Sequence, residues 1–223
     1  MHGEPGGVAS QAVAGPASGG DDDARACYAG GMNVALRKPM TLPQFLAWEE
    51  RQELRYEFDG VQPVARTGGT AAHSAIQRNL LVALGSRLRG KPCQPHGSEL
   101  KIEVAGRIRY PDAFVVCMLV PPRATVVAAP VVVFEILSES TANTDLVETN
   151  QEYRATPSIR RYVIVEQDKP GAVAFVRKAE DWVCDILSDP GAMLSLPEIG
   201  IELPLAELYE GIETTAAETE AAG

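Results

Sequence analysis

The chain of 223 residues lacks several features that would place it in a specialised class of protein. No apolar run approaches the roughly 20 residues that a helix needs to cross a bilayer, which excludes a membrane-spanning helix. The first residues have neither the basic start nor the continuous apolar stretch of a secretory signal, so we expect no export by that route. The cytoplasm is therefore the predicted location.

Cysteine is scarce and widely spaced. The four cysteines are Cys27, Cys93, Cys117 and Cys184, which form no CxxC motif and have no histidine pair nearby. Zinc sites and disulfide frameworks both depend on closely patterned cysteines, so neither is indicated. We expect buried free thiols.

Acidic residues outnumber basic residues. The sequence has 20 lysines and arginines against 30 aspartates and glutamates, which gives a formal charge of −10 at pH 7. This charge opposes attachment of the whole surface to DNA or to an anionic membrane. Any contact with DNA must therefore be local, where a few basic side chains gather beside a metal.

Composition divides the chain into three parts. Residues 1–39 are rich in Gly, Ala, Ser and Pro, contain three consecutive aspartates from Asp21, and show no sustained apolar period. We expect them to form a disordered extension. A single domain is expected over residues 40–212, because this length suits one sizeable core, and a flexible tail over residues 213–223.

Local patterns predict both helices and strands within the domain. Thr41 and Gln44 form a capping box at a helix start, and Thr70 caps a longer helix with an apolar residue at every fourth position. Between them, an alternating segment turns at Asp59-Gly60, which is typical of a hairpin. The expected helices cover residues 41–52, 70–90, 142–154 and 204–209, and the expected strands cover the hairpin at 54–64 and residues 99–104, 109–117, 131–138, 161–165, 172–177 and 182–187.

The most informative feature is a carboxylate, Glu135, inside the apolar run from Val131 to Leu137. An ionised carboxylate in a buried strand is costly unless a counter-charge, a proton or a metal compensates it. Asp112 lies in the preceding strand-like segment, and the spacing allows a turn that brings the two side chains face to face. Two carboxylates with the backbone carbonyl of Ile136 form an oxygen set that suits Mg²⁺ or Mn²⁺, and such an ion can activate water. The competing interpretation is a structural pair neutralised by arginine.

The order of the motifs resembles a bacterial family, the Uma-two family of restriction-endonuclease-like proteins, within the PD-(D/E)XK nuclease superfamily. The likeness covers about residues 40 to 210. Its motifs are Thr41 to Glu49, Tyr56-Glu57-Phe58-Asp59-Gly60, His73 to Leu88 with Asn79, Pro111-Asp112, Glu135-Ile136-Leu137 with Ser138-Glu139-Ser140-Thr141, Tyr153, and Arg160-Arg161-Tyr162-Val163-Ile164-Val165. The resemblance implies an α/β (α+β) fold with a restriction-endonuclease-like core, in which helices flank a mixed central β-sheet on both sides. It also implies a divalent-metal phosphodiesterase site on Asp112 and Glu135.

The superfamily also has a catalytic lysine, which the resemblance places at Thr149 of this chain. Threonine carries no charge and cannot stabilise a hydroxide as an ammonium does, which puts catalytic competence in question. A second acidic position of the family is Arg161 here. Lys101 is a candidate substitute for the missing lysine, but its alternation with Leu100 and Ile102 predicts a solvated face of a sheet.

Two further residues have open interpretations. The resemblance places Glu57 near the metal as an outer carboxylate, and His73 there as a hydrogen-bonding or water-positioning group. Taken alone, Glu57 is an exposed hairpin residue, and His73 is a satisfied histidine near a helix start. Trp182 and Tyr162 are expected in the core.

The favoured function is a Mg²⁺- or Mn²⁺-dependent endonuclease that hydrolyses DNA. We expect a homodimer, because two sites cut both strands of a duplex most easily. The alternative, which Thr149 keeps open, is a catalytically impaired relative that acts as a binding or regulatory module. A third hypothesis is a metal-dependent hydrolase of a small phosphorylated substrate, which the acidic surface suits better. No helix-turn-helix or zinc module indicates a cognate DNA site.

Overall fold

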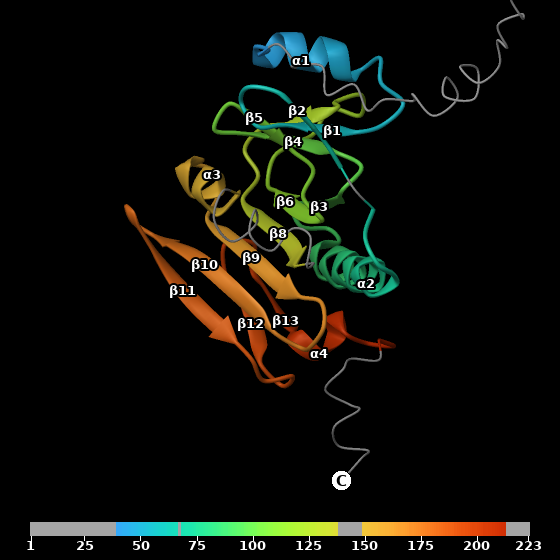
Figure 1. Cartoon of the computed structure of the whole chain (residues 1–223). Helices are drawn as coiled ribbons and strands as arrows, with labels where there is room; N and C mark the ends of the chain where they lie inside the picture. The colour runs from blue at the N-terminus through green and yellow to red at the C-terminus, as the bar shows by residue number, and fades with distance from the viewer. Residues whose placement is uncertain (1–38, 67, 138–148, 213–223) are drawn as a thin grey trace, which may run out of the picture. The chain divides into compact units, whose positions relative to one another are not determined.

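In the computed structural model, which describes residues 39–66, 68–137 and 149–212, a six-stranded sheet forms the centre of the domain (Figure 1). Its spatial order is β11-β10-β9-β8-β6-β3. Strands β8 and β9 run parallel and the other neighbours run antiparallel, so the sheet is mixed as expected. The strands are β3 (Gln94–Gly97), β6 (Ala113–Val116), β8 (Val132–Leu137), β9 (Arg161–Glu166), β10 (Ala172–Lys178) and β11 (Asp181–Leu187).

A second sheet has five strands in the order β2-β1-β5-β4-β7, and β12 pairs with β13 separately. The expected hairpin at Asp59-Gly60 is confirmed, since β1 and β2 pair antiparallel and Gly60 has a φ of 96°, a conformation that favours glycine. The bounds are β1 (Tyr56–Phe58), β2 (Pro63–Ala65), β4 (Lys101–Val104), β5 (Arg107–Arg109), β7 (Val126–Val127), β12 (Met193–Leu196) and β13 (Ile201–Pro204).

The two longer helices, α1 (Leu42–Glu49) and α2 (Ala71–Leu88), begin where the capping residues predict. The backbone N–H of Gln44 donates to Thr41 Oγ1, and the N–H of Thr41 donates to Gln44 Oε1, which completes the capping box. Thr70 Oγ1 accepts the N–H of His73 at 3.1 Å and so caps α2. The short helices α3 (Asn150–Ala155) and α4 (Leu205–Leu208) follow later in the chain.

Apolar side chains cover both faces of the six-stranded sheet. On one face, Phe134 of β8 is buried with Leu80 and Leu84 of α2, and with residues of α4 and the β12–β13 pair. On the other face, Val133 is buried with Tyr153 of α3 and with residues of β4 and β7. Helices therefore lie on both sides of the central sheet, as expected, and the five-stranded sheet covers part of the second side.

The strand expected over residues 109–117 is two strands in different sheets, so that prediction was wrong. Strand β5 ends at Arg109 in the five-stranded sheet, and β6 begins at Ala113 in the six-stranded sheet. The chain crosses between the sheets through Tyr110, Pro111 and Asp112, and Pro111 has no N–H to give to a ladder.

For the three cysteines in the described residues, the expectation of buried free thiols was also wrong, while Cys27 lies outside those residues. Cys93 and Cys117 form a disulfide bond, and Cys184 is free but exposed. The reason is strand register: Gln94 of β3 lies opposite Val116 of β6, so the next antiparallel pair outward is Cys93 and Cys117. The sequence predicted no strand over residues 94–97, and without β3 the pairing of these cysteines was invisible.

The expected extension over residues 1–39 and tail over residues 213–223 lie almost entirely outside the described residues, as does the first part of the helix expected over residues 142–154. Within the described ranges, no helix combines the length and apolar character that crossing a membrane requires.

Candidate functional site

The two carboxylates singled out in the sequence lie beside each other at one end of the central sheet. Strand β6 pairs antiparallel with β8 in a register that sets Ala113 opposite Phe134. One step further along both strands, Asp112 comes next to Glu135. The backbone N–H of Asp112 donates to Glu135 Oε2 at 3.3 Å, which ties the two residues together directly.

Asp112 is held from two elements. Its Oδ2 accepts the backbone N–H of Ile136 at 2.8 Å and lies 3.1 Å from Nε2 of His73, at the start of α2. The residue is only 4% exposed. Within the described part of the chain, no hydrogen bond or ion pair reaches Oδ1 of Asp112, so this oxygen is the one left for a ligand.

Glu135 is positioned by the phenol of Tyr153. The hydroxyl of Tyr153, on α3, donates to Glu135 Oε1 at 2.7 Å. Burial and the neighbouring Glu135 carboxylate raise the pKa of Tyr153 well above its usual value, so the hydroxyl keeps its proton and remains a donor. Glu135 faces α3 rather than α2 because residues alternate along β8, and Phe134 and Ile136 fill the α2 side.

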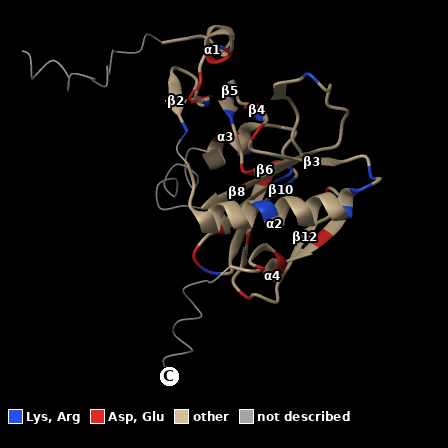
Figure 2. Ribbon diagram, turned by 90° about the vertical axis from the view of Figure 1, so that its right-hand side faces the viewer, with Lys and Arg blue, Asp and Glu red and all other residues tan. Residues whose placement is uncertain are grey.

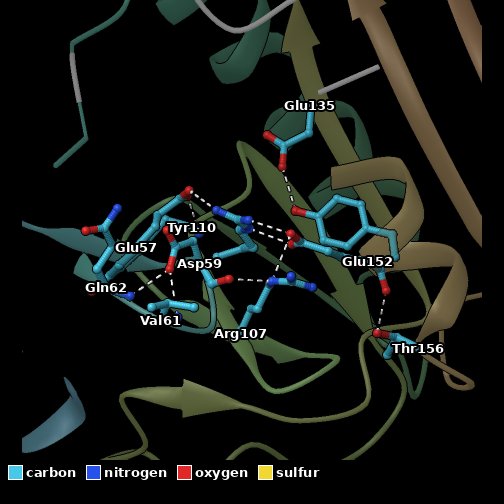
Figure 3. A network of polar contacts seen from close by, with 11 residues as sticks. Glu57, Asp59, Val61, Gln62, Arg107, Tyr110, Glu135, Glu152 and Thr156 are labelled. Atoms are coloured by element: carbon cyan, nitrogen blue, oxygen red, sulfur yellow. Dashed lines mark hydrogen bonds and ion pairs between the residues drawn. The ribbon is translucent and has the colours of Figure 1, made fainter. Parts of the chain in front are cut away.

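A network of ion pairs with the buried Arg109 and Glu152 at its centre adjoins this site and is seen in Figure 3. Arg109 donates to both oxygens of Glu152, at 2.7 and 2.6 Å, and to Glu57 Oε2 at 3.0 Å. Glu57 Oε1 accepts the N–H of Tyr110 at 3.0 Å, and Arg107 adds a contact to Glu152 at 3.3 Å. Burial alone would lower the pKa of Arg109, but Glu152 and Glu57 raise it, so Arg109 stays charged.

Glu57 and His73 differ in whether they contact Asp112. Glu57 is occupied by Arg109 and Tyr110 and, among the described residues, makes no hydrogen bond or ion pair to Asp112. His73 does contact Asp112. Glu152 and Tyr153 are neighbours on α3, so this helix joins the ion network to Glu135.

Sequence reasoning missed two residues that position the pair. Gln77 Nε2 donates to the backbone carbonyl of Asp112 at 2.8 Å and so fixes the turn that carries the aspartate. A helical signal was available, because Gln77 lies one turn after His73 on α2. From the sequence, Tyr153 was identified only as a residue of the family motif, and nothing in the sequence indicated its contact with Glu135.

Comparison with known proteins identifies the family. Residues 42–206 match the Uma2 family, whose description is "Putative restriction endonuclease". The chain belongs to the Uma2 family. Among similar proteins, an uncharacterized protein of Synechocystis sp. is 29% identical over 174 residues, which are 76% of this chain and 90% of that protein. A second uncharacterized Synechocystis protein is 26% identical over 143 residues, which are 61% of this chain and 80% of that protein.

A solved structure shares the fold of this Uma2 chain. It is described as a "putative nuclease belonging to DUF820" from Anabaena variabilis, and it aligns with a TM-score of 0.65 at 19% sequence identity. The alignment covers 77% of this chain and 98% of that chain. This likeness and the mixed sheet with helices on both sides confirm the expected fold class.

The structure shows the surroundings of the two positions where this Uma2 chain departs from the expected pattern, Thr149 and Arg161, and of Lys101, the candidate substitute for the lysine. Thr149, at the expected lysine position, is buried at the start of α3, and its side chain makes no capping hydrogen bond. Arg161, at an expected acidic position, donates to both carboxylate oxygens of Glu198 at 3.1 and 3.0 Å. Lys101 is buried, so its predicted solvated position was wrong, and its Nζ donates to Glu49 at 2.5 Å.

Charged residues of both signs are spread through the domain. Figure 2 shows Lys and Arg in blue and Asp and Glu in red at scattered places along the ribbon of the described residues. Trp182, expected in the core, is only half-buried on β11, where the Arg177 guanidinium lies 4.5 Å from its ring centroid. Tyr162 is fully buried as predicted.

Proposed function

We propose that this protein is a divalent-metal-dependent endonuclease that hydrolyses DNA phosphodiester bonds, with Asp112 and Glu135 as its central residues. The observation that carries the proposal is the pairing of these two acidic residues on neighbouring strands, where the backbone N–H of Asp112 donates to the Glu135 carboxylate at the end of a largely apolar sheet. The placement of His73 against Asp112 supports it, as does the description of the Uma2 family.

The donor chemistry fits Mg²⁺ or Mn²⁺. Asp112, Glu135 and the backbone carbonyl of Ile136 would supply oxygen ligands, which both ions prefer. In the described ranges, no group of three or more His, Cys, Asp and Glu side chains is placed to hold a metal. The protein would thus contribute few ligands, and water and phosphate oxygens would complete the shell, as is usual for Mg²⁺. When bound, the ion would activate water and offset charge on the scissile phosphate.

The surrounding residues would fix the two carboxylates in place. Tyr153 donates a hydrogen bond to one oxygen of Glu135, and the N–H of Asp112 donates to the other. The N–H of Ile136 orients Asp112. His73 Nε2 lies where it can hold or exchange a proton at Asp112 Oδ2. Glu57 would act indirectly, since its partner Arg109 anchors Glu152 on the helix that carries Tyr153.

A second candidate function is a binding or regulatory module that keeps the fold and has lost catalysis. Thr149 favours it, because an uncharged side chain at this position cannot stabilise a developing negative charge as lysine does. The formal charge of −10 also favours it, since an acidic protein attracts DNA weakly.

The decisive experiment is nicking of supercoiled plasmid by the full chain with Mg²⁺ or Mn²⁺, with Mn²⁺ titration calorimetry in parallel. We expect wild type to nick DNA, Asp112→Asn and Glu135→Gln to lose nicking and Mn²⁺ binding, and Thr149→Lys to nick faster. Glu103→Gln is the matched control, because Glu103 is an exposed carboxylate on β4. If wild type and Thr149→Lys both bind Mn²⁺ but leave DNA intact, the nuclease proposal fails and the binding module replaces it.

A further inference from the structure

Strand β11 forms one edge of the six-stranded sheet. Strand β11 covers Asp181–Leu187 and pairs with β10 on one side, and among the described residues no strand pairs with its other side (Figure 1). An edge strand presents a row of backbone N–H and C=O groups that another strand can pair with.

This edge has few of the features that prevent such pairing. Natural edges are blunted by charged side chains, proline or a bulge; the seven residues of β11 include no proline or basic residue and pair with β10 without a bulge, and their only charged side chains are Asp181 and Asp185. Apolar side chains are also exposed here. Ile186 is 75% exposed and Val183 is 42% exposed, and the free thiol of Cys184 is exposed between them.

The exposed face of β11 is apolar along its length. Side chains alternate along a strand, so Trp182, Cys184 and Ile186 share one face and the two aspartates lie on the other. Cys184 lies opposite Phe175 and Ile186 lies opposite Val173 of β10, while Trp182 lies opposite Arg177, whose guanidinium stacks on its ring. The combination of free backbone groups and an apolar row fits another β-strand of the same character.

We propose that β11 pairs antiparallel with β11 of a second copy of this chain, about a two-fold axis at Cys184. Such an axis is perpendicular to the sheet. Directly paired residues must point to the same side of the joined sheet, so the axis passes through a residue and not between two residues. Of the permitted registers, the one centred on Cys184 overlaps all seven residues of the strand. It sets Trp182 against the partner's Ile186 and Cys184 against the partner's Cys184.

Charge selects the same register. A dimer centred on Val183 would set Asp181 opposite the partner's Asp185, and one centred on Asp185 would oppose that residue to itself. Like charges directly opposite one another destabilise a strand pair. In the register centred on Cys184, each aspartate meets an apolar residue instead, either Leu187 or Val183 of the partner subunit. The pairing would join the two six-stranded sheets into one.

The first test is the oligomeric state of the full chain by sedimentation velocity over a concentration series. We expect a dimer for wild type and for Cys184→Ser, which keeps the size of the side chain. Cys184→Asp would oppose two carboxylates at the axis and raise the dimer Kd about a hundredfold, since like charges at an interface cost several kcal/mol. Val82→Lys is the control, because Val82 is an exposed apolar residue on α2, away from β11, and should leave the dimer intact.

The second test fixes the register with a short bis-maleimide cross-linker, in a Cys27→Ser background. Cys184 should cross-link the two copies. Moving the thiol with Cys184→Ser and Asp181→Cys should abolish the cross-link, because the two thiols would then be six residues, or about 20 Å, apart. A monomeric wild type, an undisturbed Cys184→Asp dimer, or equal cross-linking from both positions would each overturn the proposal. None of these readouts depends on nuclease activity.

Discussion

Breaking the disulfide between Cys93 and Cys117 should lower the stability of the domain by a predictable amount. The bond closes a loop with a sequence separation of 24 residues and ties the edge strand β3 to β6. In the chain-entropy description, a loop of this size restricts the unfolded chain by about 3.5 kcal/mol at 25 °C. For a domain of this length, that loss corresponds to a fall in Tm of roughly 7–14 °C.

The cleanest perturbation is Cys117→Ser, measured by differential scanning calorimetry without reductant. Cys117 is exposed, so serine costs little there beyond the bond, and the Cys93 thiol left behind is buried among apolar side chains, where free cysteine is well accommodated. Cys184→Ser is the control, since it replaces an exposed cysteine outside the bond and should change the unfolding free energy by about 0.5 kcal/mol or less.

Wild type treated with a phosphine reductant should reproduce the Tm of Cys117→Ser. A fall of less than about 2 °C in both would refute the entropic reasoning, which requires the cross-link to be present and to restrict the unfolded chain. Non-reducing peptide mapping decides between those two requirements, because it detects the linked peptides directly. Disulfides are rare in a reducing cytosol, so the reduced protein gives the stability relevant to the predicted cytoplasmic location.

Three further predictions concern single side chains. Burial lowers the pKa of His96 below its ordinary value of about 6.5. The unfolded chain therefore binds more protons than the folded chain, and the free energy of unfolding falls as the pH drops below that value. His96→Gln should reduce the fall in Tm between about pH 7.5 and 5. Arg161→Ala should cost about 3 kcal/mol in urea unfolding, because Glu198 loses its bidentate partner, and adding Glu198→Ala should recover part of that loss. Tyr153→Phe should weaken Mn²⁺ binding about tenfold by freeing Glu135, as measured by calorimetry.

Each of these has a clear contrary outcome. Identical pH profiles for wild type and His96→Gln would mean that another group governs acid sensitivity. A loss of stability in the double variant of Arg161 and Glu198 that equals the sum of the two single losses would show that the pair is not coupled. Unchanged Mn²⁺ affinity in Tyr153→Phe would remove Tyr153 from the site and leave it a packing role.

Local structure was largely predictable from the sequence, because its causes lie within a few residues. The capping box at Thr41, the cap at Thr70 and the turn at Gly60 all act between residues near in the chain. Strands such as β8 and β9 were predictable because continuous runs of β-branched and apolar residues favour a buried sheet. Strand β3 was not, because its Gln-Pro-His-Gly sequence has no strand pattern of its own and pairs only because β6 offers an edge.

The candidate site also has one part that was predictable from the sequence and one part that was not. The sequence by itself determined that Asp112 and Glu135 are anomalous, because a carboxylate in an apolar run is costly wherever the chain folds. Only the tertiary structure decided which groups compensate for that cost by hydrogen bonds or ion pairs. Tyr153 and His73 reach the two carboxylates from helices far away in sequence, while Lys101 is turned away to Glu49. Such contacts depend on how strands and helices pack, and no local pattern records that packing.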